Sequence, residues 1–198
     1  MIISIQKTDG SWYGSWAICF TYACWFGIEA LALDEISRKA NKTLIDKCCG
    51  FLLSKQMSDG GWGESYQSCV RKEYRDSESG HVVCTAWALL SLVLANPKAT
   101  ASANVVQAVE RGVRFLMNSQ LPNGDWAQQS ISGVFNRNCM ISYSNYRYPY
   151  CSFARCLHHP HFQLIHEILQ KYFSDMGSRS FCELAMIFLS GDTFCSIP

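Results

Sequence analysis

Hydrophobic positions along this chain fall into two kinds of helical pattern. In the first kind one apolar stripe follows a single helix face, as at Val105, Val109, Val113 and Leu116, which are spaced i, i+4, i+8 and i+11. Residues 44–52 repeat this kind of spacing. In the second kind the segment is apolar on most sides, and it occurs at residues 16–33, 81–95 and 138–146. A helix with one apolar stripe packs by that stripe, whereas a helix that is apolar all round must be enclosed, so the pattern predicts alternating outer and inner helices.

A seven-residue pattern, Q-x-x-x-G-x-W, recurs between the predicted helices. Its three copies are Gln6, Gly10 and Trp12; Gln56, Gly60 and Trp62; and Gln120, Gly124 and Trp126. A Gln amide can satisfy backbone groups left free at helix ends, Gly allows a sharp turn, and an indole packs broadly while donating one N–H. We therefore interpret the three Gln/Trp turns as structural clamps, with no catalytic residue among them.

Outer helix, Gln/Trp turn and inner helix thus follow one another along the chain. The residues before the turns repeat as well, since Lys47 and Arg111 each stand nine residues before the next Gln. Stacked repeats of this kind form a two-layer ring, so the expected fold class is all-α, a partial α/α barrel or toroid. Three repeats form an arc rather than a closed ring, which indicates that the chain is part of something longer.

Composition excludes several classes of protein. Hydrophobic residues make up 48% of the 198 residues and charged residues 17%, the opposite of the balance that keeps a chain disordered. A net charge of +1 offers no electrostatic footprint for nucleic acid, so no nucleic-acid partner is expected. Residues 16–33 are apolar but contain Glu29, and a membrane-spanning helix needs about 20 apolar residues with few or no charges. We expect no spanning helix, whereas monotopic attachment to a membrane stays open.

Eleven cysteines raise the question of disulfides and metal sites. The first residues do not resemble a secretion signal, which favours a reducing compartment and free thiols. Cys19, Cys24 and Cys84 lie among large apolar residues and are expected to act as small buried hydrophobes. No C-x2-C pair occurs, and the nearest candidate ligands are two cysteines and four histidines within residues 151–166. We interpret that segment as ordinary polar chain and expect no metal.

Three runs near the Gln/Trp turns resemble the triterpene cyclases, the family that contains squalene–hopene cyclase and the oxidosqualene cyclases. The runs are DGSWYGSWAICFTY at residues 9–22, GGWGESYQSC at residues 60–69 and GVFNRNCMISY at residues 133–143. The likeness covers residues 6–147 and fits the eukaryotic oxidosqualene branch better than the bacterial squalene branch. It implies that residues 1–147 form the C-terminal part of a cyclase α/α-barrel domain.

The resemblance also implies a function, that of an isomerase of sterol and triterpene biosynthesis acting on 2,3-oxidosqualene. In this family an aspartic acid protonates the epoxide, and a carbocation cascade closes the rings inside the barrel without a metal or an organic cofactor. Matched motif by motif, the cation-stabilising aromatic residues of the cavity correspond to Trp16, Phe135, Tyr143 and Tyr146. The family further implies peripheral, monotopic attachment to the endoplasmic reticulum membrane or to lipid droplets.

Two departures from the family pattern change what this chain is expected to do. The Asp-Cys-Thr-Ala-Glu motif that carries the catalytic acid is absent, and Cys84-Thr85-Ala86, followed by Trp87, does not replace it. Aromatic walls cannot supply general acid catalysis, so we expect no catalytic residue here and no cyclase activity from the isolated chain. From residue 148 the resemblance ends, and residues 148–198 are expected to be a divergent tail with a helix over residues 160–173.

Two alternative functions stay open from the sequence. The first is a non-catalytic helical module whose apolar inner helices bind a hydrophobic ligand or a partner chain. The second is an α/α-barrel prenyltransferase subunit, which would need a zinc site built from Asp, Cys and His. The Gly-Ser-Trp and Gly-Val-Phe-Asn runs disfavour the second alternative.

Overall fold

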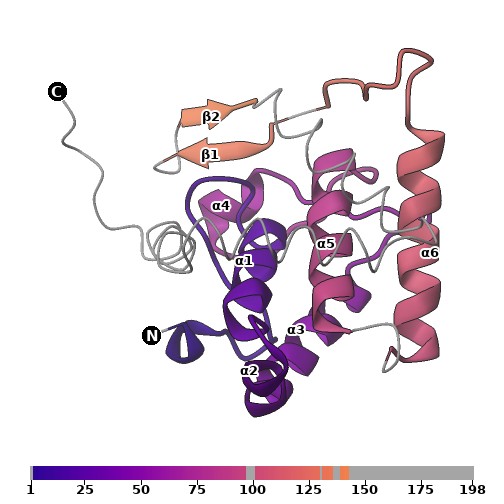
Figure 1. Ribbon diagram of the computed structural model, residues 1–198. Helices are drawn as coiled ribbons and strands as arrows, with labels where there is room; N and C mark the ends of the chain where they lie inside the picture. Colours follow the sequence, from indigo (N-terminus) through magenta and orange to yellow (C-terminus); the bar gives the residue numbers. More distant parts are fainter. Residues whose placement is uncertain (1, 97–100, 130, 136–138, 143–198) are drawn as a thin grey trace, which may run out of the picture.

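Most of the described chain is helical, as the hydrophobic pattern predicts (Figure 1). The computed structural model describes residues 2–96, 101–129, 131–135 and 139–142. Its elements are the 3₁₀ turn η1 (Ile3–Ile5), the helices α1 (Thr21–Leu31), α2 (Glu35–Ala40), α3 (Lys42–Ser54), α4 (Gln67–Arg71), α5 (Val82–Ala95) and α6 (Ala103–Asn118), and the strands β1 (Gly133–Phe135) and β2 (Cys139–Ile141). The expected all-α class is confirmed, with the addition of one small two-stranded sheet.

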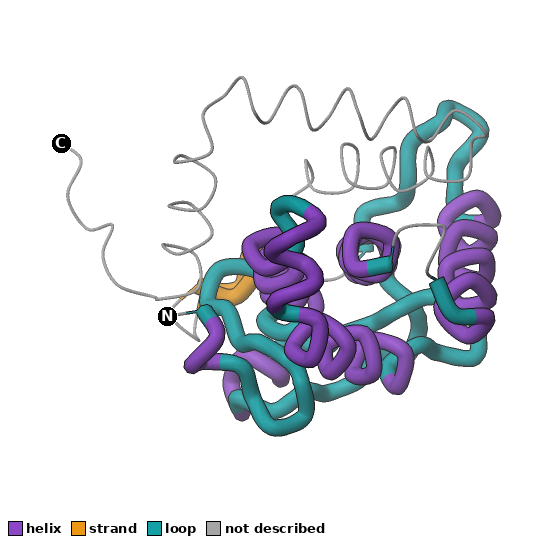
Figure 2. Tube along the Cα trace, turned by 60° about the horizontal axis from the view of Figure 1, so that its bottom comes forward, coloured by secondary structure: helices purple, strands orange, loops and turns teal. Residues whose placement is uncertain are grey.

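Helix α5 lies at the centre of the packing, and its neighbours α1, α3 and α6 surround it (Figures 1 and 2). It is buried along most of its surface, as expected for an inner helix. Helix α6 instead buries one stripe, formed by Val105, Ala108, Gly112, Val113 and Leu116. The contrast confirms the predicted distinction between an inner helix over residues 81–95 and an outer helix that contains residues 105–116.

Two of the predicted inner helices differ from the structure. Helix α1 begins at Thr21 rather than at residue 16, because the preceding residues form a turn in which Gly14 N donates to Cys19 O at 2.9 Å. The predicted helix over residues 138–146 is wrong in its described part, where β2 pairs antiparallel with β1 and places Met140 opposite Val134. A short apolar run does not by itself distinguish a helix from a strand.

The three Gln/Trp turns share one pattern of hydrogen bonds. In each copy the Gln amide nitrogen donates to the carbonyl oxygen of the Gly four residues later, at 2.9, 2.8 and 2.6 Å. Each indole N–H donates to a carbonyl oxygen ten residues earlier, at Ile2, Leu52 and Leu116 in turn. Leu52 and Leu116 lie in the last turns of α3 and α6. Two of the tryptophans therefore satisfy carbonyl groups that a helix end leaves without a helical partner.

The first two turns are also hydrogen-bonded to the outer helix of the following repeat. Gln6 Nε2 donates to Leu44 O of α3 at 2.8 Å, and Gln56 Nε2 donates to Ala108 O of α6 at 2.8 Å. One amide group thus closes its own turn and binds the next helix. These bonds support the interpretation of the turns as clamps between successive outer helices.

The glycines of the turns have φ values of +91°, +89° and +86°, in the region that favours glycine over residues with a side chain. Gly10 and Gly60 also lie directly against the backbone of Lys47 and Arg111 on the next outer helix. The recurrence of Lys47 and Arg111 at one spacing in the sequence therefore marks the place where each outer helix crosses the preceding turn.

Gly60 and Gly124 form a matched pair for mutation, because only Gly60 is crowded. An ideal Cβ on Gly60 would lie 2.9 Å from Arg111 O, whereas the nearest atom to a Cβ on Gly124 is Gln120 Nε2 at 4.0 Å. Gly124→Ala is expected to cost about 1 kcal/mol from the left-handed backbone alone, and Gly60→Ala about 2–4 kcal/mol because overpacking is added. Urea denaturation measures both, and equal losses would contradict the close approach at Gly60.

Candidate active-site wall

The structure brings two of the predicted cavity aromatics together. The ring centroids of Trp16 and Phe135 lie 4.8 Å apart with an interplanar angle of 48°. Both side chains are half-buried. Trp16 lies in the turn before α1 and Phe135 ends β1, so Trp16 is not on an inner helix, contrary to the predicted helix over residues 16–33. Tyr143 and Tyr146 lie outside the described residues.

The turn that carries Trp16 is attached to its surroundings through the backbone. Trp16 N donates to the hydroxyl of Tyr22, the second residue of α1, at 3.0 Å. Ile18 N donates to Ser132 O at 3.0 Å. Because Ser132 directly precedes β1, this bond joins the Trp16 turn to the strand that carries Phe135. Hydrogen bonds from backbone N–H groups therefore hold the Trp16 turn both to α1 and to the residue that precedes β1.

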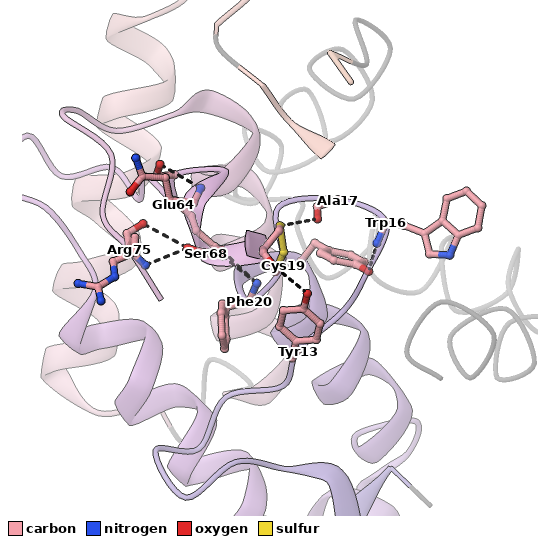
Figure 3. Close-up of a disulfide and its surroundings, with 12 residues drawn as sticks. Tyr13, Trp16, Ala17, Cys19, Phe20, Glu64, Ser68 and Arg75 are labelled. Carbon is pink, nitrogen blue, oxygen red and sulfur yellow. Dashed lines mark hydrogen bonds between the residues drawn. A yellow bond between two sulfur atoms is a disulfide. The ribbon is translucent and has the colours of Figure 1, made fainter. Parts of the chain in front are cut away.

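Glu64 binds the first residues of α1 from the side of the second Gln/Trp turn (Figure 3). Its carboxyl group accepts hydrogen bonds from Phe20 N at 3.0 Å, from Thr21 N at 2.8 Å and from Thr21 Oγ1 at 2.7 Å. The side chain is 0% exposed. The first N–H groups of a helix have no helical partner and carry partial positive charge, so a carboxyl group here caps α1.

The sequence analysis did not single out Glu64, although a repeated signal exists. Gln129 has the same role at α5, where its Oε1 accepts a hydrogen bond from Val82 N at 2.7 Å. Glu64 follows Trp62 by two residues, and Gln129 follows Trp126 by three. A residue with a side-chain acceptor just after each of these two turns thus caps the inner helix of the preceding repeat.

Two buried carboxyl groups have a raised pKa. Burial raises the pKa of Glu64 to about 7, against the hydrogen bonds from Thr21 and Phe20, which lower it. Burial alone raises the pKa of Glu29, on α1, to about 7. Within the described residues Glu29 Oε2 has no hydrogen-bond partner. Folding therefore favours the neutral form of both acids.

The raised pKa of Glu29 predicts a pH dependence of stability. Below pH 4.5, the ordinary pKa of Glu, the side chain is neutral in both the folded and the unfolded chain, and its burial costs least. As the pH rises from 4.5 to about 7, the unfolded chain ionises while the folded chain stays neutral, so the free energy of unfolding falls. Glu29→Gln removes the ionisation, so the variant should gain about 3 kcal/mol relative to the parent chain between pH 4.5 and 7. Urea titrations of both proteins across this range measure the difference, and parallel pH profiles would contradict the prediction.

A disulfide joins Cys19 of the Trp16 turn to Cys69 of α4 (Figure 3). The expectation that the cysteines are free thiols is therefore wrong for this pair. The Cα atoms lie 5.6 Å apart, within the usual range for disulfides. The expectation of free thiols came from the predicted reducing compartment, which does not consider how close two cysteines lie in the fold. The other cysteines in the described part of the chain, which form no disulfide, are Cys24, Cys48, Cys49, Cys84 and Cys139.

The remaining sequence candidates have structural partners or lie elsewhere. Thr85, in the run that partly matches the acid motif, exchanges hydrogen bonds with the backbone of Trp62 through its hydroxyl. Across the described ranges, no group of three or more His, Cys, Asp or Glu side chains is placed to hold a metal. The cysteines and histidines of residues 151–166 lie outside those ranges. None of the described helices is both long enough and apolar enough to cross a membrane.

Comparisons with known proteins agree with this architecture. A family model described as the squalene–hopene cyclase C-terminal domain matches residues 1–158. The chain is 46% identical to lanosterol synthase from Homo sapiens over 145 residues, which are 72% of this chain and 19% of that protein. It is 52% identical to cycloartenol synthase from Dictyostelium discoideum over 146 residues, 74% of this chain and 20% of that protein. The chain thus spans about a fifth of the length of these curated relatives.

Proposed function

This chain belongs to the squalene–hopene and oxidosqualene cyclase family, and on that premise we propose that it supplies one wall of the cavity in which 2,3-oxidosqualene is cyclised to a triterpene alcohol. The observation that carries the proposal is the contact between Trp16 and Phe135, two residues remote in sequence whose rings lie 4.8 Å apart. The proposal assigns Tyr143 to the same wall because it ends the run over residues 133–143 that resembles the family, and it assigns Tyr146 because that residue corresponds to a neighbouring tyrosine of the family.

The proposed role of the wall is to stabilise positive charge that develops on the substrate. The face of an aromatic ring attracts a cation, most strongly for Trp, and a desolvated contact contributes about 2 kcal/mol or more. The two rings are tilted and their faces point in different directions. Positive charge that moves from one carbon of the substrate to another can therefore stay in contact with a ring face. This chemistry needs neither a metal nor an organic cofactor.

Opening of the epoxide is assigned to a proton donor that this sequence does not contain, because the Asp-Cys-Thr-Ala-Glu motif is absent. The isolated chain is therefore expected to leave 2,3-oxidosqualene unchanged. Incubation followed by gas chromatography of the neutral lipids tests this expectation, and any cyclic triterpene would contradict it.

Binding of a charged substrate mimic tests the wall itself. The probes are a squalene analogue with a quaternary ammonium group and a matched analogue with a quaternary carbon at the same place. The chain should bind the ammonium analogue about 30-fold more tightly, the equivalent of about 2 kcal/mol. The Trp16→Leu/Phe135→Leu variant should lose most of this preference. Equal binding by the parent chain would overturn the proposal and favour a general hydrophobic carrier.

Peripheral attachment to the endoplasmic reticulum membrane or to lipid droplets is the proposed location. It is supported by the relation to the cyclases and by a substrate that partitions into lipid. Fractionation of cells that express the tagged chain, with an alkaline carbonate wash to release peripheral proteins, tests the location. Recovery in the soluble fraction alone would contradict it.

A further inference from the structure

The Trp16 turn is fixed at its far end by one short segment of the chain, residues 64–69. Two contacts join them. Cys19 is bonded covalently to Cys69, and Glu64 accepts the hydrogen bonds of Phe20 N and Thr21 N. Both cysteines and Glu64 are almost completely buried, at 0–1% exposure. Figure 3 shows the Trp16 indole projecting from the turn on the side away from Glu64.

The segment that holds the turn is itself held in place. Ser65 N donates to Arg75 O at 2.8 Å, and Arg75 N donates to Ser68 Oγ at 2.9 Å. Glu64 also forms an isolated antiparallel bridge with Asp76. Residues 64–69 are therefore hydrogen-bonded to the chain that precedes α5. The segment that contacts the Trp16 turn thus has a defined position of its own.

A turn without regular structure does not by itself hold a large side chain in one place, because connecting segments are more mobile than the elements they join. Groups that act on a substrate need placement to about 0.5 Å, and surrounding residues provide it. Close to Trp16 the turn is held by hydrogen bonds, from Trp16 N to the Tyr22 hydroxyl and from Ile18 N to Ser132 O. The end near α1 carries the covalent bond and the buried carboxyl group.

We propose that the Cys19–Cys69 disulfide and Glu64 are positioning residues, which together hold the Trp16 indole against Phe135. We name residues 64–69 with these two contacts the brace. The inference rests on the proposed function for its catalytic meaning, but the position of Trp16 can be measured without substrate. The brace acts on the Trp16 indole through the turn that carries it.

Fluorine NMR of the full chain labelled with 5-fluorotryptophan tests the brace. Single Trp→Phe substitutions assign the six tryptophan resonances, and Phe135→Leu shows how the Trp16 resonance changes when its ring neighbour is lost. In Cys19→Ser/Cys69→Ser, and separately in Glu64→Ala, which removes the side-chain acceptor, the Trp16 resonance should shift towards its Phe135→Leu position or broaden. The Trp62 and Trp126 resonances should keep their native positions, which shows that the clamps remain folded.

Cys139→Ser is the matched control, because Cys139 is an exposed thiol directly opposite Phe135 in the hairpin. It should leave the Trp16 resonance unchanged. Dithiothreitol should reproduce the shift in the parent chain by converting the disulfide to two thiols while the dithiol becomes its own cyclic disulfide. It should have no effect on Trp16 in Cys19→Ser/Cys69→Ser.

The two proposals fail in different ways. An unmoved Trp16 resonance in folded Cys19→Ser/Cys69→Ser and in folded Glu64→Ala would overturn the brace, whatever the chain binds. A moved resonance supports the brace even if the parent chain binds the ammonium and carbon analogues equally, a result that would overturn the cation wall instead. If both proposals hold, the preference for the ammonium analogue should shrink severalfold in Cys19→Ser/Cys69→Ser.

Discussion

Replacing Cys19 and Cys69 with serine is expected to lower the free energy of unfolding by about 4 kcal/mol. The disulfide closes a loop with a sequence separation of 50 residues, and it restricts the unfolded chain over that length. In the folded chain both cysteines are buried, so the variant also places two hydroxyl groups in an apolar site. The loss should appear as a lower urea midpoint.

Reduction separates the effect of the cross-link from that of the substitutions. Dithiothreitol should lower the midpoint of the parent chain almost to that of Cys19→Ser/Cys69→Ser and should not affect the variant. Cys139→Ser, which changes an exposed thiol, should stay within about 0.5 kcal/mol of the parent chain. A parent chain that is equally stable with and without reductant would show that the disulfide does not form in solution.

The helices could be predicted because their physical signal is local and repeats along the chain. The stripe from Val105 to Leu116 fixes which face of α6 is buried, and that face is the one that contacts α5. The Gln/Trp turns carry their own hydrogen bonds within seven residues, so the pattern contains most of the structure of each turn. These parts of the fold require no knowledge of distant contacts.

The supports of the Trp16 turn could not be predicted in this way. The disulfide depends on the distance between Cys19 and Cys69, which is set by the packing of α4 against the turn and has no local signal. Glu64 is a charged residue type that is rarely buried without partners, and only the structure shows the free N–H groups of α1 that it caps. The β1–β2 hairpin was missed because three-residue strands leave no clear periodicity.

The tryptophans of this chain have two different structural settings, and mutation should separate them. Trp62 is 0% exposed, donates to Leu52 O at 2.7 Å and packs against Gly112 of α6. Trp16 is half-buried and packs against the ring of Phe135. A clamp residue should contribute mainly to stability, whereas a wall residue should contribute mainly to ligand recognition.

Trp62→Ala is accordingly expected to lower the free energy of unfolding by about 4 kcal/mol, through the loss of a large buried side chain and the cavity it leaves. Trp62→Phe keeps most of the packing and loses the indole N–H, so it should cost about 1–2 kcal/mol. Trp16→Ala should cost only about 1–2 kcal/mol, because the indole is half-buried.

Binding of the squalene analogues should show the opposite order, because substitution of Trp16 should weaken ligand recognition more than substitution of Trp62. Trp62→Phe should retain the preference for the ammonium analogue over the carbon analogue, because its indole contacts helix backbone rather than the wall. Trp16→Ala should lose much of that preference while remaining folded. If Trp16→Ala unfolds the chain as readily as Trp62→Ala, Trp16 belongs to the core. If instead it stays folded and keeps the full preference, the Trp16–Phe135 pair is not the surface that recognises positive charge.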